Sequence, residues 1–366
     1  TSHEFFSKLC LLKGYLNLSK EFINLNDLKS AKLQINKHIN ILIEVIELGK
    51  ITINKFEKEY FRNYKDKFFK NFQSIYNFCS FKKYKKFPKR LTFVLGNHRN
   101  GTSALTGLLC KNDLLGFPLK KLEIDEHNQK GYWELRSIWQ NNDDLLNKIG
   151  LNWKSIYNID SNWIYEENCF DWQNNFLNII NQELEGLDFP VIKDPRFCFL
   201  IKGLKFWYEI DINKFSFIIP IRHPLEVVLS LKKRQKNMDT TFASSSEFLK
   251  LYVSSLFELE QATRYIDRLI IDFEEIINDP NSVIKKCSLF LYQKKINKCK
   301  DSFVTQKLRH QNYKYIDNSE EDLFDTKIYG LACKLYKLIK SGNFTENLNV
   351  SINEIDKLKN IYSKLN

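Results

Sequence analysis

The stretch that decides the fold runs from Leu91 to Leu109 and reads LTFVLGNHRNGTSALTGLL. Its first five residues, Leu91–Leu95, predict a strand, and Gly96 and Gly101 bracket the loop that follows. Apolar residues then recur with the i, i+3, i+4 spacing of a helix face. A strand, a glycine loop and a helix N-terminus together predict a phosphate cradle, because backbone N–H groups and the helix dipole then face an anion.

The loop departs from the Walker A motif at one position. In G-x-x-x-x-G-T-S, Thr102 occupies the place of the Walker lysine. That lysine reaches the β- and γ-phosphates of a nucleoside triphosphate, so its absence argues against such a ligand. Arg99 supplies a cation two residues before Gly101 instead.

Composition narrows the class of protein. The 366 residues are 43% hydrophobic, enough for a sizeable core, and the net charge of +12 suits an anionic ligand. Lys, Asn, Ile and Phe are abundant throughout, which favours a generally basic surface over a nucleic-acid face, and we expect no nucleic-acid partner. Eight cysteines without a C-x-x-C pair predict free thiols in a reducing, cytoplasmic setting and no metal site. No apolar run approaches the roughly 18–20 residues of a membrane span.

The pattern along the chain predicts three parts. Residues 1–88 read as a helical N-terminal arm, either tetratricopeptide-like or an ordinary hairpin, that could bind a protein partner. Residues 89–318 alternate strands (91–95, 190–192, 215–221 and 268–273) with helices. Residues 319–366 read as a C-terminal helical extension. The middle part predicts an α/β fold: a parallel sheet with helices on both faces in three layers.

Polar side chains follow three of these strands. His98 and Arg99 lie in the first loop, and the second strand is followed by KDPR, residues 193–196. Arg222 follows the third strand, and Ser230 comes eight residues later, inside a helix where its hydroxyl needs a partner. Because ligands of open parallel sheets bind at the carboxyl ends of strands, we expect these groups to meet at one site.

Two of these motifs resemble those of a known family, the sulfotransferases. HRNGTSAL resembles their 5′-phosphosulfate loop, in which Arg99 takes the place of the family's basic residue. RHPLEVVLSL resembles their 3′-phosphate motif, with Arg222 and Ser230 at the matching spacing. NQKGYWE, KDPR and VTQKLRH are similar to stretches of the bacterial branch, so the resemblance spans about 91–312.

The resemblance implies a P-loop-like sulfotransferase fold and the donor 3′-phosphoadenosine-5′-phosphosulfate, whose product is adenosine 3′,5′-bisphosphate. The sulfuryl group would pass to the hydroxyl or amine of a glycan, lipid or small molecule, without a metal. The donor-binding residues implied are Asn97, Arg99, Asn100, Gly101, Thr102, Ser103, Ala104, Lys193, Arg196, Arg222, Ser230 and Arg309. Arg99 is also the expected catalytic cation.

Several residues compete for the role of general base. Glu134 is the first candidate, since the family often uses a carboxylate or histidine near this region, and its alternative role is a helix N-terminal carboxylate. The other candidates are His98, His127, Glu126 and Asp194. Two roles fit the KDPR residues Lys193, Asp194 and Arg196 equally well. They would either form a structural ion-pair cluster or take part directly in catalysis.

Two other functions stay open on the sequence. Ile270-Ile271-Asp272 resembles a Walker B strand and would suit a kinase-like triphosphate enzyme, and a non-catalytic binding module would keep the fold alone. Five tryptophans between residues 132 and 172 would either stack on an acceptor ring or fill the core: Trp133, Trp139, Trp153, Trp163 and Trp172.

Overall fold

The computed structural model describes residues 88–119, 122–124, 130–187, 189–204, 214–237, 243–264, 266–292, 303, 326–341 and 348–365. All but the last residue of the predicted N-terminal arm, and the predicted boundary at residues 318–319, lie outside these ranges. The predicted α/β part is described over most of its length.

Four parallel strands form the central sheet. They are β1 (Leu91–Val94), β2 (Val191–Ile192), β3 (Phe215–Ile221) and β4 (Arg268–Asp272), in the order β2-β1-β3-β4. The continuous apolar runs of β1 and β3 suit this arrangement, since inner strands of a parallel sheet are covered on both faces. The predicted α/β fold class is confirmed.

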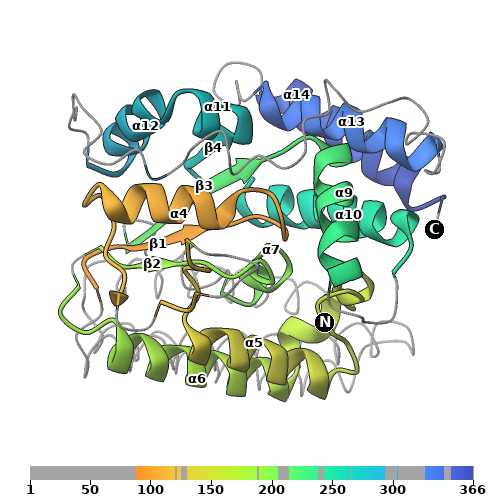
Figure 1. The fold of residues 1–366 in the computed structure, drawn as a ribbon. Coiled ribbons are helices and arrows are strands. Elements are labelled where there is room, and N and C mark those ends of the chain that lie inside the picture. Colours follow the sequence, from red (N-terminus) through yellow and green to blue (C-terminus); the bar gives the residue numbers. More distant parts are fainter. Residues whose placement is uncertain are drawn as a thin grey trace, which may run out of the picture.

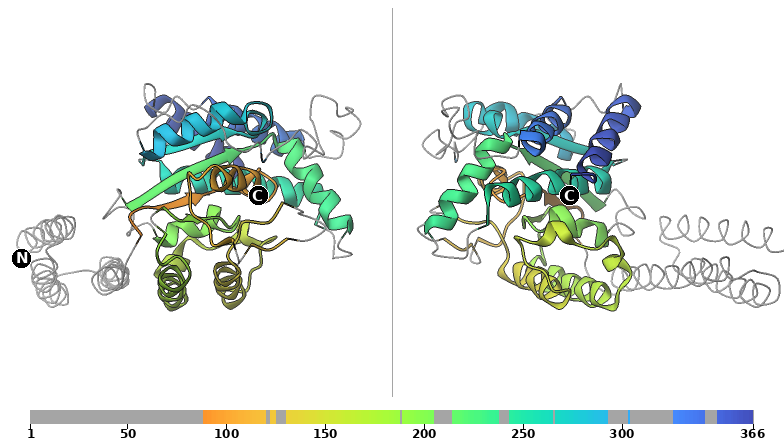
Figure 2. Two further views of the ribbon diagram at one scale, coloured as in Figure 1. Left: turned by 60° about the vertical axis from the view of Figure 1, so that its left-hand side comes forward. Right: turned by 90° about the vertical axis from the view of Figure 1, so that its right-hand side faces the viewer.

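Helices cover both faces of the sheet. In the view of Figure 1, α12 lies above the sheet and α5 and α6 lie below it. Figure 2 shows α5 and α6 side by side, on the opposite side of the sheet from α12 and α13. The helix bounds are α4 Thr102–Lys111, α5 Arg136–Lys148, α6 Glu167–Glu183, α7 Phe197–Leu200, α9 Pro224–Asn237, α10 Ser245–Thr263, α11 Phe273–Asn278, α12 Pro280–Tyr292, α13 Thr326–Lys340 and α14 Leu348–Tyr362. Three short 3₁₀ helices complete the described elements: η2 Ile156–Asn158, η3 Ser161–Tyr165 and η4 Ile201–Leu204.

Aromatic side chains fill the layer below the sheet. The Phe93 ring of β1 lies 5.3 Å from that of Phe197 on α7 and 6.3 Å from that of Phe176 on α6, measured between centroids. Trp172 stacks on Phe176 at 6.0 Å. These rings pack α6 and α7 against β1.

The C-terminal helices pack against α10. Arg264 at the end of α10 forms an ion pair with Asp356 of α14 at 2.6 Å, and the hydroxyl groups of Ser254 and Tyr362 are hydrogen bonded at 3.0 Å. Leu335 of α13 is fully buried in the same core as the strands. These two helices therefore share the core of the α/β unit.

One predicted boundary needed correction, and one short helix was not predicted. The strand predicted for residues 268–273 ends at Asp272, because that side chain accepts a hydrogen bond from the Glu274 amide and caps α11. The helix α7 was not predicted, since its four residues are all buried and carry no amphipathic pattern.

Candidate active site

A small cavity lies where β1 and β2 end, next to α9. Its volume is about 100 Å³, and its walls come from the loop after β1, the segment before α5, the segment after β2, and α9. This is the carboxyl edge of the sheet that the sequence predicted. The lining residues are His98, Arg99, Thr102, Ser103, Tyr132, Glu134, Trp139, Trp153, Lys193, Pro195, Arg196 and Arg234.

The loop after β1 turns sharply into α4. Arg99 and Gly101 both have positive φ, 69° and 92°. A Cβ on Gly101 would stand 2.4 Å from Cδ2 of Phe273, so glycine is required there for space as well as conformation. α4 starts at Thr102 with no side-chain cap and no acidic residue in its first turn, which leaves its N-terminal amides available to an anion.

The two predicted nucleotide motifs touch each other. Nε of Arg99 donates to Oγ of Ser230 at 2.8 Å, and a guanidinium nitrogen of Arg222 donates to the backbone carbonyl of Arg99 at 3.2 Å. The hydroxyl of Ser230, predicted to need a partner, therefore receives one from the cradle loop. Residues that are 131 positions apart in the chain form one polar cluster.

Arg222 is held from several directions. Its Nε donates to Glu226 one turn along α9 at 2.7 Å, and its guanidinium lies 4.2 Å from the ring centroid of Phe273. The hydroxyl of Tyr252 donates to its backbone carbonyl at 2.8 Å. Its side chain is almost wholly buried, so this arginine is fixed in position.

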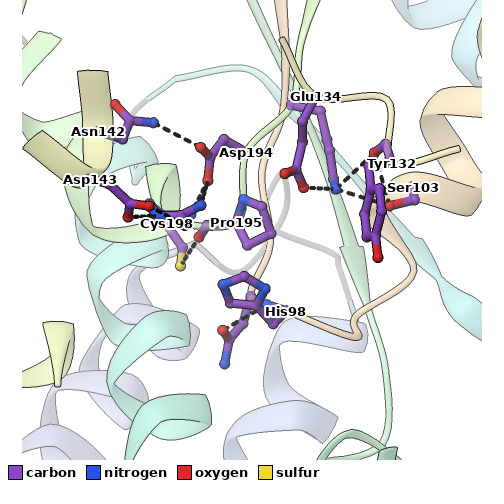
Figure 3. A network of polar contacts seen from close by, with 12 residues as sticks. His98, Ser103, Tyr132, Glu134, Asn142, Asp143, Asp194, Pro195 and Cys198 are labelled. Carbon is purple, nitrogen blue, oxygen red and sulfur yellow. Dashed lines mark hydrogen bonds and ion pairs between the residues drawn. The ribbon is translucent and has the colours of Figure 1, made fainter. Parts of the chain in front are cut away.

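Lys193 and Glu134 form the second cluster. Nζ of Lys193 donates to the Glu134 carboxylate, to Oγ of Ser103 at 2.9 Å and to the backbone carbonyl of Tyr132 at 3.1 Å. Figure 3 shows Glu134, Tyr132 and Ser103 together on one side of Pro195. The three acceptors fix the ammonium group beside the start of α4.

Arg196 and Asp194 belong to a third cluster. Figure 3 shows its members Asp194, Asp143 and Asn142 on the other side of Pro195. Arg196 donates to Asp143 through two nitrogens, at 2.6 and 3.0 Å, and to Asp194 at 3.0 Å. Asn142 donates to the second oxygen of Asp194 at 3.1 Å. Asp194 is 1% exposed and does not line the cavity, which favours the structural interpretation of this carboxylate.

Buried polar atoms without partners lie in the cradle loop. Among the described residues, nothing hydrogen bonds to Nδ2 of Asn97, to Nε2 of His98, or to either side-chain polar atom of Asn100. Buried polar atoms normally have partners, and of these residues only His98 lines the cavity, so its Nε2 atom is the one placed to meet a polar ligand there. The uncapped helix and the basic lining fit an anionic group such as the phosphosulfate of the implied donor.

Positive charge dominates the electrostatics of the cavity. The pKa of His98 lies well below its usual value, first because of burial and then because of the charges of Arg196, Arg234, Lys193 and Arg99. Burial, followed by Arg234 and Arg222, lowers the pKa of Arg99 to about 10. His98 is therefore neutral at pH 7, whereas Arg99 is still charged.

Glu134 is the carboxylate that lines the cavity. Burial raises its pKa, while the ammonium group of Lys193 acts in the opposite direction. Such a carboxylate is a stronger base than an exposed one, which suits the predicted role.

The tryptophans divide between core and cavity. Trp133, Trp163 and Trp172 are buried in the core, whereas Trp139 and Trp153 are half-buried and line the cavity. The rings of Trp153 and His98 lie 4.6 Å apart.

Arg234 also lines the cavity and was not among the predicted site residues. Its place four residues after Ser230, on the same face of α9, was the sequence signal that could have identified it.

Other predicted residues lie apart from the cavity. Ala104 is half-buried in the first turn of α4 and does not line the cavity. Asp272 accepts from the Glu274 amide and pairs with Lys340. That aspartate lies at the end of β4, which pairs with β3 and not with β1. Arg309, His127 and Glu126 lie outside the described residues.

Searches for other kinds of site were negative over the described part of the chain. No group of three or more His, Cys, Asp or Glu residues there could hold a metal ion. No helix there is long and apolar enough to cross a membrane. The described cysteines are free thiols, as predicted: Cys110, Cys169, Cys198, Cys287 and Cys333.

Comparison with solved structures gives a weak structural likeness. No family model and no curated protein matches the chain. The sulfotransferase domain from the Synechococcus PCC 7002 olefin synthase is similar in structure with a TM-score of 0.35 and 15% sequence identity. The match covers 69% of this chain and 96% of that one. Assignment of a function to this chain therefore rests on its own residues.

Proposed function

We propose that this protein is a sulfotransferase that moves a sulfuryl group from 3′-phosphoadenosine-5′-phosphosulfate to an acceptor hydroxyl or amine. The observation that carries the proposal is the hydrogen bond between Arg99, which lines the cavity, and Ser230, which joins the two motifs of the resemblance in one polar cluster. A site for a ligand with anionic groups at both ends requires such a junction.

Different residues would bind the two anionic groups of the donor. Arg222, with Ser230, would hold the 3′-phosphate, and its ion pair with Glu226 keeps the guanidinium oriented. Arg99 and the amides of Gly101, Thr102 and Ser103 would hold the phosphosulfate at the N-terminus of α4. Adenosine triphosphate lacks a 3′-phosphate, so Arg222 and Ser230 would favour the phosphosulfate donor over it.

When bound, the donor supplies a sulfuryl group attached to a phosphate leaving group. The protein's contribution is positioning and charge stabilisation, because the transferred group is already an electrophile. Lys193 is oriented by Ser103, Tyr132 and Glu134 beside the cradle, where its charge would stabilise the leaving oxygen. This cation takes the part that the Walker lysine has in triphosphate enzymes.

Two groups compete to accept the acceptor's proton. Glu134 lines the cavity and has a raised pKa, but Lys193 is bonded to its carboxylate. His98 is neutral, and its Nε2 has no partner among the described residues. We assign the proton to Glu134, because burial raises the pKa of its carboxyl group, whereas burial and the surrounding cations lower the pKa of His98 and make it the weaker base.

The test measures donor binding and transfer on the full chain. Calorimetry should show binding of adenosine 3′,5′-bisphosphate without metal, at least about tenfold tighter than adenosine 5′-phosphate. Sulfuryl transfer from labelled donor to a panel of phenol, amine and saccharide acceptors should follow. Binding of ATP with Mg²⁺ in preference to the bisphosphate would overturn the proposal and favour a triphosphate enzyme. Tight bisphosphate binding without transfer to any acceptor would favour a non-catalytic module.

A further inference from the structure

Arg234 is a cation of the cavity for which the described residues provide no counter-charge. Lys193 is paired with Glu134, and Arg196 is paired with Asp143 and Asp194. In the described part of the chain, no hydrogen bond or ion pair involves the Arg234 guanidinium, although it faces the same cavity.

Repulsion between Arg234 and its neighbours indicates that a second anion belongs there. Arg234 is the largest charge effect on the pKa of Arg99, ahead of Arg222, and it also lowers the pKa of His98. In the proposed function the phosphosulfate compensates Arg99, and the 3′-phosphate compensates Arg222. Neither anionic group of the donor then compensates Arg234. An unpaired cation in a partly buried site costs free energy, because it loses hydration without gaining a counter-charge.

The surroundings of Arg234 differ from those of the proposed 3′-phosphate site. Arg222 and Ser230 do not line the cavity, whereas Arg234 lines it together with Trp139 and Trp153. Half-buried tryptophan rings present flat apolar faces that pack against sugar or aromatic rings. The cations that lie over these rings are Arg196, 5.8 Å from the Trp139 centroid, and Lys154, 5.7 Å from the Trp153 centroid. A cavity lined by Arg234 and by two such rings is suited to a ring that carries a negative charge.

We infer that Arg234, Trp139 and Trp153 form an acceptor subsite that selects an anionic acceptor, in which a carboxylate or an existing sulfate lies next to a sugar or aromatic ring. This inference rests on the proposed function, which it deepens by naming the substrate class.

The experiment uses two probes that differ by one carboxylate, 4-nitrophenyl β-glucuronide and 4-nitrophenyl β-glucoside. Their affinities for the full chain are measured by calorimetry, with and without saturating adenosine 3′,5′-bisphosphate. We expect the wild type to prefer the glucuronide by about tenfold or more, the scale of one charge-assisted hydrogen bond. Arg234→Ala should abolish that preference, and Arg234→Lys should retain part of it. Lys233→Ala removes an exposed charge from the same helix and should leave the preference unchanged.

Other outcomes overturn the inference. If the wild type binds the two glycosides equally, or binds neither at about 10 mM, the subsite does not select an anionic acceptor. If Arg234→Ala weakens adenosine 3′,5′-bisphosphate by about tenfold while the glycoside preference survives, Arg234 belongs to the donor site. A wild type that prefers the glucuronide but does not bind the bisphosphate contradicts the proposed function and leaves the anion site standing.

Discussion

The Nε atom of Arg99 lies 2.8 Å from the Oγ atom of Ser230, and this hydrogen bond ties the cradle loop to α9. The loop follows β1 and the serine lies in the helix that follows β3. β1 and β3 pair in register, with Val94 opposite Ile218, and this pairing brings their carboxyl ends together. The contact is therefore a product of sheet topology.

The Arg99–Ser230 contact predicts coupled losses. Arg99→Ala should lower turnover by about 100-fold or more, as for other groups that stabilise transferred charge, and Ser230→Ala should weaken adenosine 3′,5′-bisphosphate. In a double-mutant cycle on bisphosphate affinity, the two changes should be non-additive by about 0.5–3 kcal/mol. Calorimetry on the wild type and three variants measures this. Additive losses would show that the two side chains act separately.

Arg222 should make the protein bind adenosine 3′,5′-bisphosphate in preference to adenosine 5′-phosphate. The variant Arg222→Ala, however, also leaves Glu226 buried without its partner. Glu226 is 1% exposed, so Arg222→Ala should cost about 3–5 kcal/mol of stability by itself. The double variant Arg222→Met with Glu226→Met removes both charges and keeps the volume. That variant should remain folded by circular dichroism and bind adenosine 3′,5′-bisphosphate no better than adenosine 5′-phosphate. A retained preference would assign the 3′-phosphate to other residues.

Gly101 and Gly150 form a matched pair. Both have positive φ, 92° and 74°, but a Cβ meets Phe273 at 2.4 Å in the first case and nothing within 4 Å in the second. Gly150→Ala should cost only the backbone strain, about 1–2 kcal/mol. Gly101→Ala should cost more and should weaken bisphosphate binding. Urea unfolding of both variants gives the comparison, and equal losses would contradict the steric explanation.

Acid should destabilise the protein through its histidines. Burial lowers the pKa of His98 well below its usual value and that of His223 to about 4. Below about pH 6.5 the unfolded chain binds protons that the folded chain does not, so stability falls as the pH falls. The slope reaches at most about 1.4 kcal/mol per pH unit for each histidine. Denaturant unfolding between about pH 7 and 5 should show this, and His98→Gln should make the slope shallower.

The Glu134 assignment predicts a loss of rate without a loss of donor binding. Glu134→Gln keeps the shape of the side chain but cannot accept the acceptor's proton, so turnover should fall by about 100-fold or more. The affinity for adenosine 3′,5′-bisphosphate should change little, because Lys193 keeps its bonds to Ser103 and Tyr132. His98→Gln is the comparison. A fast Glu134→Gln enzyme and a slow His98→Gln enzyme would move the role to the histidine.

Local sequence patterns predicted several of the strands and helices. The β3 strand was predicted with its observed bounds, and β1 and the start of α4 follow from the glycine loop. The helix cap formed by the Asp272 carboxylate was not predicted from the sequence. A polar side chain can end a strand or begin a helix, and only the fold decides which. Short buried α7 escaped for a similar reason, since it has no polar face to mark its period.

The sequence by itself determined which side chains are available to a site: the glycine loop with its one departure from Walker A, Arg222 and Ser230 at their spacing, and the KDPR turn. Chain order makes these local signals readable, because each lies directly after a strand. Only the tertiary structure decided their partners. In the structure Arg99 is hydrogen bonded to Ser230, Lys193 is paired with Glu134, and Asp194 is buried in a separate cluster. Arg234 and Trp153 line the same cavity. Distances between residues far apart in the chain are set by strand order and by helix packing, neither of which leaves a local pattern in the sequence.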